Sequence, residues 1–526
     1  MANKQKPVVT KQIYSMNNFL VSCYLLIMFA FFELFLTNGY YSVRTDKYWF
    51  FIVLTCALAV GVTVVSIANN FGNSKDTPKL QTPFFKMSVT DYAFVAFLVF
   101  AYITTLFSDY VSDSITGNAG RNNGLILLSM YLIAYIIVSR FFYYKEYVLV
   151  SFIIGGYIVS ALAIVNFYYF DPLGIFANLD PWYKNNFGST IGNKNYIAIY
   201  MCIFLAVALM MFVIYNKRYM KILCGVGIVL AYLGLLTAGS NSGYIGLFAM
   251  LFAMIAVCIR KPKYICNLML GITIMFASGL ILRLVAIFLP KNKGYESIGE
   301  ELIYGTSVFY IIAVLAVITV ALYLIQNTKF ATNHWPKNTL TITVVLVALS
   351  IVGVFAYLMY YYTFVDTTKD LGALNHLLRF DERWGTHRGV MWIGGMEEYL
   401  KFDIFDKLFG SGCDTFYHVF EPHFGELYLY GGDTDTNCAH NEYLNYLVTQ
   451  GALGLLSYLT IIITTIYRAF KNSKNTPLIL VFVMPVIAYC AQAVVNIYQP
   501  VNTPFLIIFI ALCEALSRKS CNINHM

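Results

Sequence analysis

The sequence predicts an all-α membrane protein, a polytopic transmembrane helical bundle of about 14 spans with one large extracytoplasmic loop. The first reason is composition: 59% of the 526 residues are hydrophobic and 12% are charged, against roughly 45–50% and 25% in soluble domains. The second is the length of the apolar runs, which match the about 20 residues that a helix needs to cross a bilayer. The third is that these runs do not alternate apolar and polar residues, as barrel strands would.

The predicted spans divide the chain into three parts. Spans 1–11 lie in residues 1–362, the large loop covers residues 363–442, and spans 12–14 with a cytoplasmic C-terminus lie in residues 443–526. No small-residue cleavage site follows the first run, so we interpret it as a membrane helix and not as a signal peptide. The apolar runs cover residues 18–37, 48–67, 91–108, 123–139, 147–166, 195–214, 222–238, 243–259, 264–289, 307–326, 340–362, 443–467, 477–494 and 502–517.

Lysine and arginine predict the orientation of the spans. Every loop on one side of the predicted bundle is basic, which marks that side as cytoplasmic. With an even number of spans, both termini then lie in the cytoplasm. The net charge of +8 follows this distribution, so it indicates a lipid bilayer as the partner and no nucleic acid.

The loop of residues 363–442 is where we expect the chemistry. Its tryptophans, phenylalanines and tyrosines provide enough apolar surface for a packed structure, and an ordered loop of this length is usually functional. Its two cysteines, Cys413 and Cys438, leave a disulfide and two free thiols as alternatives.

His440 lies where this loop meets the predicted twelfth span. A histidine at the outer end of a membrane helix is close to water and able to accept a proton. The alternative is an interfacial histidine that only caps the helix.

Three arginines, Arg379, Arg383 and Arg388, cluster in the same loop. The guanidinium group suits fork-like binding of phosphate. The alternative is that these arginines pair with Asp381, Glu382 and other acidic residues of the loop.

Two further patterns are weaker. Asp433, Asp435 and Asn437 resemble the start of a calcium loop, but the turn glycine and the closing glutamate of such a loop are missing, so a solvated acidic turn is the alternative. Glu33 and Arg283 lie within predicted spans, where charge is functional by default, although Arg283 is close enough to the outer helix end to reach the interface.

Several motifs together resemble one protein family. AHNEYLNYLVTQGALGLLSYL (residues 439–459) is similar to the "HNxYL…GxxGLL" signature of the O-antigen ligase / O-antigen polymerase family, bacterial membrane glycan transferases. HRGVMW (387–392) resembles its "GRxxxW" element, LFGSGCDTF (408–416) its "GxGPDTF" element, and GSTIGNKNY (188–196) its "GxxGNxN" element. GNAGRNNG (117–124) resembles the arginine-glycine turn after the third span.

The resemblance covers roughly residue 90 to the C-terminus and departs from the family at two positions. Asn241 stands where members often carry an arginine, and Cys413 where they carry a proline. The first departure removes one inferred phosphate contact.

The resemblance implies transfer of a glycan from a polyprenyl-diphosphate carrier, usually undecaprenyl, to an acceptor hydroxyl outside the bacterial cytoplasmic membrane. The acceptor is a glycan or glycolipid, and neither a cofactor nor a metal is implied. His440 would be the general base and Arg388 the main contact of the diphosphate, while Glu442 is the nearest alternative base. The further substrate-binding residues that we expect are Arg121, Lys194, Asn193, Asn195, Asp414, Arg283, Asn441 and Glu442.

A ligase and a polymerase share this donor, and no motif separates them. A transporter or flippase of lipid-linked glycans is the second class that we considered. The long loop, the few charges inside the spans and the lack of visible internal repeats argue against it.

Overall fold

The chain is almost entirely helical in the computed structural model, which describes residues 16–71, 86–118, 120–177, 179–290, 292–295, 297–432 and 436–523. In these residues the strands are limited to one short antiparallel pair, β1 (Phe187–Gly188) and β2 (Gly192–Asn193). The all-α prediction is therefore confirmed.

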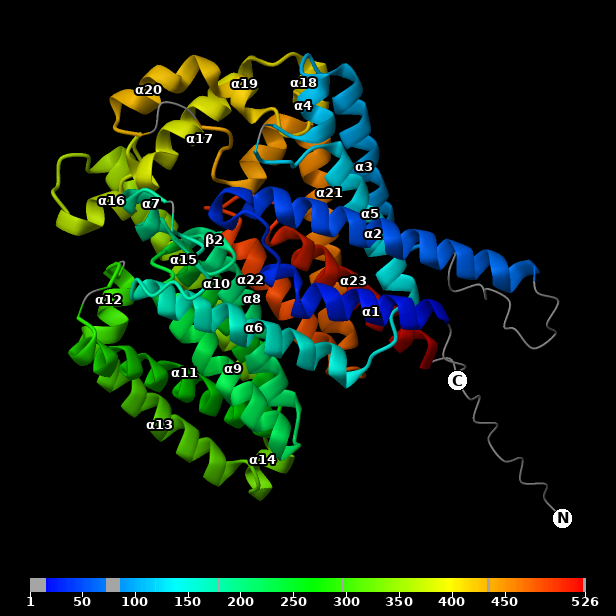
Figure 1. Ribbon diagram of the computed structural model, residues 1–526. Helices are drawn as coiled ribbons and strands as arrows, with labels where there is room; N and C mark the ends of the chain where they lie inside the picture. Colours follow the sequence, from blue (N-terminus) through cyan, green and yellow to red (C-terminus); the bar gives the residue numbers. More distant parts are fainter. Residues whose placement is uncertain are drawn as a thin grey trace.

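Long apolar helices form the body of the molecule (Figure 1). They are α1 (Met16–Ala30), α2 (Gly39–Phe71), α3 (Val89–Phe107), α5 (Leu125–Phe141), α6 (Glu146–Phe167), α8 (Lys194–Ile214), α9 (Arg218–Thr237), α10 (Ser242–Cys258), α11 (Pro262–Phe288), α13 (Ser307–Ile325), α15 (Lys337–Tyr360), α21 (Glu442–Asn472), α22 (Ile479–Gln492) and α23 (Thr503–Ile523).

Further helices, most of them short, lie between them. They are η1 (Phe32–Leu34), α4 (Val111–Thr116), α7 (Pro181–Asn186), α12 (Ser297–Tyr304), α14 (Lys329–Asn333), η2 (Tyr361–Val365), η3 (Gly372–Leu374), α16 (Asn375–Leu378), α17 (Trp384–Lys401), α18 (Ile404–Phe409), α19 (Phe416–Phe420), η4 (Glu421–His423) and α20 (Phe424–Leu429).

Each predicted apolar run is occupied by a helix. In the part of the chain that the structure describes, nine helices are long and apolar enough to cross a membrane, and four shorter apolar helices, α1, α5, α10 and α22, accompany them. These helices indicate a multi-pass membrane protein. The number of 14 crossings and the orientation stay predictions.

Helix α8 forms the centre of the bundle. Nearly all of its residues are buried, and it packs against α6, α9, α10, α11 and α22. By contrast, α13 and α15 expose most of their apolar side chains. Apolar helices with exposed sides are stable only when lipid covers them.

The intramembrane charge Glu33 has a structural partner. Its carboxylate lies 3.9 Å from the ammonium of Lys47, and both side chains are buried. Lys47 also donates to the carbonyl oxygens of Phe32 and Phe35, each at 2.8 Å. Because Phe32 begins the short helix η1 and Phe35 is its C-cap, Lys47 holds the end of η1, which favours a structural role for Glu33.

The segment of the predicted large loop is folded. Helices α16 to α20 gather at one end of the molecule, above the first turns of α21 (Figure 1). Helices α17, α19 and α20 share a second hydrophobic cluster with α21, formed by Val390, Met391, Phe416, Phe420, Leu427, Ala439, Leu444 and Val448. This cluster fixes the segment to the bundle, as the aromatic content of the loop predicts.

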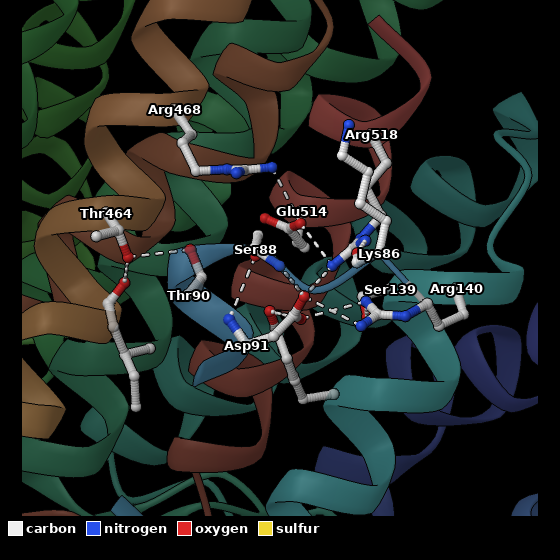
Figure 2. A network of polar contacts seen from close by, with 12 residues as sticks. Lys86, Ser88, Thr90, Asp91, Ser139, Arg140, Thr464, Arg468, Glu514 and Arg518 are labelled. Atoms are coloured by element: carbon white, nitrogen blue, oxygen red, sulfur yellow. Dashed lines mark hydrogen bonds and ion pairs between the residues drawn. The ribbon is translucent and has the colours of Figure 1, made fainter. Parts of the chain in front are cut away.

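Segments that are predicted to lie on the same side of the membrane meet at the same end of the bundle. The 117–124 turn, residues 410–415, residues 436–441 and the loop between α22 and α23 contact one another, as the hydrogen bonds described below show. Arg140, Arg468 and Arg518, all predicted to be cytoplasmic, meet in a separate network (Figure 2). The predicted topology is thus consistent with the packing.

Candidate functional site

A buried ion pair joins the 117–124 turn to the loop segment after α18. The Nε of Arg121 donates to Oδ1 of Asp414 at 2.9 Å, and both side chains are 1% exposed. The other Asp414 oxygen accepts the backbone amides of Asn118 (3.0 Å) and Asn123 (3.3 Å). All the hydrogen bonds of Asp414 therefore go to the turn, which indicates that it positions Arg121 and does not itself face a substrate.

Arg121 keeps its charge in this environment. Burial lowers the pKa of its guanidinium, but the adjacent Asp414 carboxylate, together with Cys438 and the nearby tyrosines, outweighs burial and raises that pKa. Its Nη1 donates to Oδ1 of Asn437 at 3.2 Å, and the guanidinium lies 6.0 Å from the ring centre of Tyr498. Its Nη2 is buried with no hydrogen-bond partner among the described residues, so one donor is left for another acceptor.

Cys438 and His440 form a second pair beside Arg121. The thiol is buried, which opposes its ionisation, but the neighbouring His440 and Arg121 lower its pKa to about 6. His440 is half-buried and has a left-handed backbone (φ 47°). The next residue, Asn441, caps α21, so His440 lies at the positive end of that helix.

Arg388 reaches this pair from α17. Its Nε donates to the carbonyl oxygen of Val495 at 3.2 Å and its Nη1 to that of Gly385. Among the described residues it forms no ion pair with a carboxylate, so the alternative of pairing with Asp381 or Glu382 is wrong for this arginine. Burial therefore lowers the pKa of its guanidinium, offset only in part by the nearby Cys438.

The backbone before Arg388 is unusual. Residues 385–387 have left-handed φ angles of 58°, 62° and 66°, and such strain in non-glycine residues is found mostly at functional sites. Gly389 permits the turn, because a Cβ at this position would lie 1.8 Å from the carbonyl oxygen of Asp381. The turn directs Arg388 toward the loop between α22 and α23.

One basic residue of the site was missing from the sequence prediction. Arg44, at the start of α2, lies within electrostatic reach of the phenol of Tyr196, as do Arg121 and Cys438. Arg44 Nη2 also lies 3.6 Å from the position of a Cβ on Gly120. Its only signal in the sequence is a basic residue in a short outer loop.

The loop between α22 and α23 was also missed, although it connects the parts of the site. Val495 accepts from Arg388, the Tyr498 carbonyl accepts from Asn123 at 3.1 Å, and Asn502 donates to the Tyr196 carbonyl at 2.9 Å. The amide side chains in NIYQPVN, between two apolar runs, were the available signal.

The predicted asparagines mostly stabilise helix ends. Asn193 caps α8 by accepting the amide of Asn195 at 2.8 Å, and Asn195 accepts from Ser240 Oγ at 2.6 Å. Asn441 accepts the amides of Tyr443 and Leu444 at 3.0 and 3.1 Å. These bonds occupy the side-chain oxygens and indicate structural roles.

Three predicted charged residues lie outside this cluster. Lys194 borders a pocket of about 20 Å³ together with Lys293, a volume that suits a single water. Glu442 is buried, and the phenols of Tyr458 and Tyr489 donate to it, which makes it a poor alternative base. Arg283 donates to the Tyr304 carbonyl at 3.4 Å and lies over Phe309 (5.2 Å), where it contacts none of the other predicted residues.

The structure also bears on two patterns of the large loop, the cysteine pair and the calcium-like sequence. Cys413 and Cys438 are free thiols; the Cys413 sulfur contacts Thr105 Oγ1 at 3.5 Å instead. Asp433 and Asp435 of the calcium-like pattern lie outside the described residues, and the side-chain oxygen of Asn437 is used by Arg121.

The cluster thus combines Arg44, Arg121, Arg388, Cys438 and His440, brought together from distant parts of the chain. Of its three guanidinium groups, only that of Arg121 forms an ion pair with a carboxylate, that of Asp414, among the described residues. Such a site can bind an anion, and its histidine can exchange a proton. No protein-family model matches the chain, and no curated protein is significantly similar to it.

Proposed function

We propose that this chain transfers a glycan from a polyprenyl-diphosphate carrier to an acceptor hydroxyl on the outer side of the bacterial cytoplasmic membrane, as a ligase or polymerase of surface polysaccharide. The observation that carries the proposal is the convergence of Arg121, Arg388 and His440 around Cys438. The same three residues lie in the motifs that resemble the O-antigen ligase / O-antigen polymerase family.

The arginines suit the leaving group. Cleavage of the bond between the sugar and the diphosphate leaves negative charge on the carrier, and guanidinium groups stabilise such charge where no metal is available. Arg388 is the best-placed contact, because its charge has no carboxylate partner among the described residues. An incoming diphosphate would supply the missing negative charge.

His440 suits the acceptor. The acceptor oxygen forms a bond to the anomeric carbon while the bond to the diphosphate breaks, and the hydroxyl proton passes to His440. His440 must be neutral to accept it.

Reconstitution in proteoliposomes tests the proposal. Purified protein would receive a polyprenyl-diphosphate oligosaccharide and candidate glycan or glycolipid acceptors, and mass spectrometry would follow the acceptor. We expect glycan transfer by the wild type, loss of transfer in His440→Gln, and normal transfer in His334→Gln, a matched change at an exposed histidine.

A different outcome would indicate the second functional class. If the carrier-linked oligosaccharide crosses the bilayer with unchanged length and no acceptor gains mass, the protein is a transporter or flippase and the transferase proposal is wrong.

A further inference from the structure

Helix α18 lies beside two of the membrane helices. It packs against α21 and against α3 (Figure 1). The ring centre of Phe405 in α18 is 5.1 Å from that of Phe107, the last residue of α3. Helices α3 and α21 are both long and apolar enough to cross a membrane. Although α18 belongs to the large loop, it therefore packs against two membrane helices.

Helix α21 is interrupted where it meets α18. Gly451 has φ 67° and ψ −175°, which are not helical angles, and a Cβ on Gly451 would lie 2.3 Å from a backbone carbonyl of α18. The amide of Ser411 donates to the carbonyl oxygen of Val448 at 3.1 Å. The amide of Gly412 donates to that of Thr449 at 3.0 Å. The chain that follows α18 thus supplies hydrogen bonds to α21 beside the interruption.

These contacts lie inside the predicted spans. Gly451 falls within the twelfth span, residues 443–467. Thr104 falls within the third span, residues 91–108, and donates to the carbonyl oxygens of Gly410 and Thr449 at 3.1 and 3.3 Å. Non-helical backbone at this level is stable in a membrane only where protein groups satisfy its hydrogen bonds, as they do here. The segment around α18 therefore lies at the level of the spans.

The outward face of α18 is apolar. Ile404, Phe405 and Leu408 are all exposed, and their spacing places them on one side of the helix. Leu106 and Phe107 at the end of α3 are exposed as well and continue this surface. Contiguous apolar surface of this kind is unfavourable in water and marks a site of contact with protein or membrane.

We propose that the apolar face of α18 lies in the bilayer leaflet on the side of the large loop, where lipid covers Ile404, Phe405 and Leu408. Amphipathic helices of this kind lie in the plane of the membrane, with the apolar face buried by about 5–10 Å at the boundary between headgroups and acyl chains. Lipid is the occupant that fits, because the face continues the exposed apolar surface of α3, itself a membrane helix.

The position of α18 matters for the candidate site. The chain runs from α18 directly to Asp414, whose carboxylate positions Arg121. Contact of α18 with lipid would therefore hold one member of this ion pair at a fixed depth. The proposal does not depend on the transferase activity.

Spin labels at matched positions test the proposal. Ile404→Cys and Leu429→Cys would be made in a cysteine-free version of the full chain, labelled with a nitroxide and reconstituted in liposomes of phosphatidylethanolamine and phosphatidylglycerol. Ile404 and Leu429 are equally exposed, at 80% and 79%, but Leu429 ends α20, which packs on α17 and η4 of the loop. Electron paramagnetic resonance would measure collisions of the nitroxide with oxygen, which is enriched among acyl chains, and with a nickel chelate that stays in water.

We expect the ratio of oxygen collisions to nickel collisions to be severalfold higher at position 404 than at position 429. It should differ in the direction of the value for Leu349→Cys, an exposed position within α15. Equal ratios at 404 and 429 would show that α18 lies in water and would overturn the proposal. Low collision rates with both reagents at 404 would show that protein covers α18, and would overturn it as well.

Tryptophan variants keep the native cysteines and make the test independent of the cysteine-free version. Ile404→Trp and Leu429→Trp would be placed in liposomes whose acyl chains carry bromine near the headgroups, since bromine quenches tryptophan on contact. We expect a larger quenched fraction of the fluorescence for Ile404→Trp than for wild type, and no such increase for Leu429→Trp. Equal quenching in the two variants would contradict the contact of α18 with lipid.

Discussion

Replacement of Asp414 by asparagine should destabilise the protein strongly, although the two side chains have nearly the same shape. The carboxylate accepts three hydrogen bonds, one from Arg121 and two from backbone amides. An asparagine has one oxygen and one NH2 group. Whichever way it is oriented, the NH2 faces at least one of these donors, and Arg121 loses its counter-charge.

The magnitude follows from burial. Arg121 and Asp414 are each 1% exposed, so water cannot replace the lost partner. A buried ion pair is not strongly stabilising compared with an apolar pair, but removal of one member leaves the other charge uncompensated and costs about 3–5 kcal/mol. We therefore expect Asp414→Asn to lower the free energy of unfolding by about that amount.

Denaturant titration in detergent micelles would measure this loss. Asp109→Asn is the matched control, because Asp109 is exposed and forms no side-chain hydrogen bond or ion pair with the residues that the structure describes; we expect it to change stability by less than about 0.5 kcal/mol. The double variant Arg121→Gln/Asp414→Asn should lose less stability than the sum of the single variants. If Asp414→Asn is as stable as Asp109→Asn, or if the double variant is strictly additive, the pair does not have the role that we assign to it.

Four other predictions concern the candidate site and the topology. His440→Gln should lower the transfer rate by about 10²–10⁴-fold, the usual contribution of a general base, with little change in donor binding; a wild-type rate would exclude His440 as the base. Arg388→Ala should weaken use of the diphosphate donor by roughly tenfold or more, and Arg388→Lys should rescue poorly because lysine lacks the fork, so full activity of the lysine variant would contradict bidentate binding. Alkylation of Cys438 by iodoacetamide should slow as the pH falls through about 6, since the thiolate is the reactive form; in His440→Gln the midpoint should rise, and an ordinary midpoint near 8.5 in the wild type would contradict the pair. In a cysteine-free background, an impermeant thiol reagent should label a cysteine at Lys369 and not at Asn472 in intact cells, and the reverse pattern would overturn the predicted orientation.

Most of the fold could be predicted because it depends on local composition. A run of about 20 apolar residues in a chain that cannot bury them in water has one solution in lipid, a helix. The exact starts of the helices depend on less regular contacts. Helix α2 begins at Gly39 and not near residue 48, because Asp46 accepts the Thr37 amide and hydroxyl at 2.8 and 2.7 Å and orders the turns before the apolar run.

The candidate site was predicted only in part, because some of its residues lie in sequence motifs and others do not. His440, Arg388 and Arg121 lie in motifs with a recognisable pattern, and the structure brings them together. Arg44 and the α22–α23 loop carry no such pattern. They join the site only because helices distant in sequence pack side by side.

The sequence by itself determined the all-helical class and the positions of the apolar helices. It also predicted which loops share one side of the membrane. These features depend only on hydrophobicity and charge along the chain. Only the tertiary structure decided what each polar residue does. Asp414 and Glu442 resemble substrate contacts in the sequence, yet their oxygens accept hydrogen bonds from Arg121 and backbone amides in one case and from two tyrosines in the other. Arg388 resembles its neighbouring arginines but lacks a carboxylate among the described residues. The physical reason is that a buried polar group must find partners, and whether those partners are the protein's own or a ligand's depends on which distant segments pack around it.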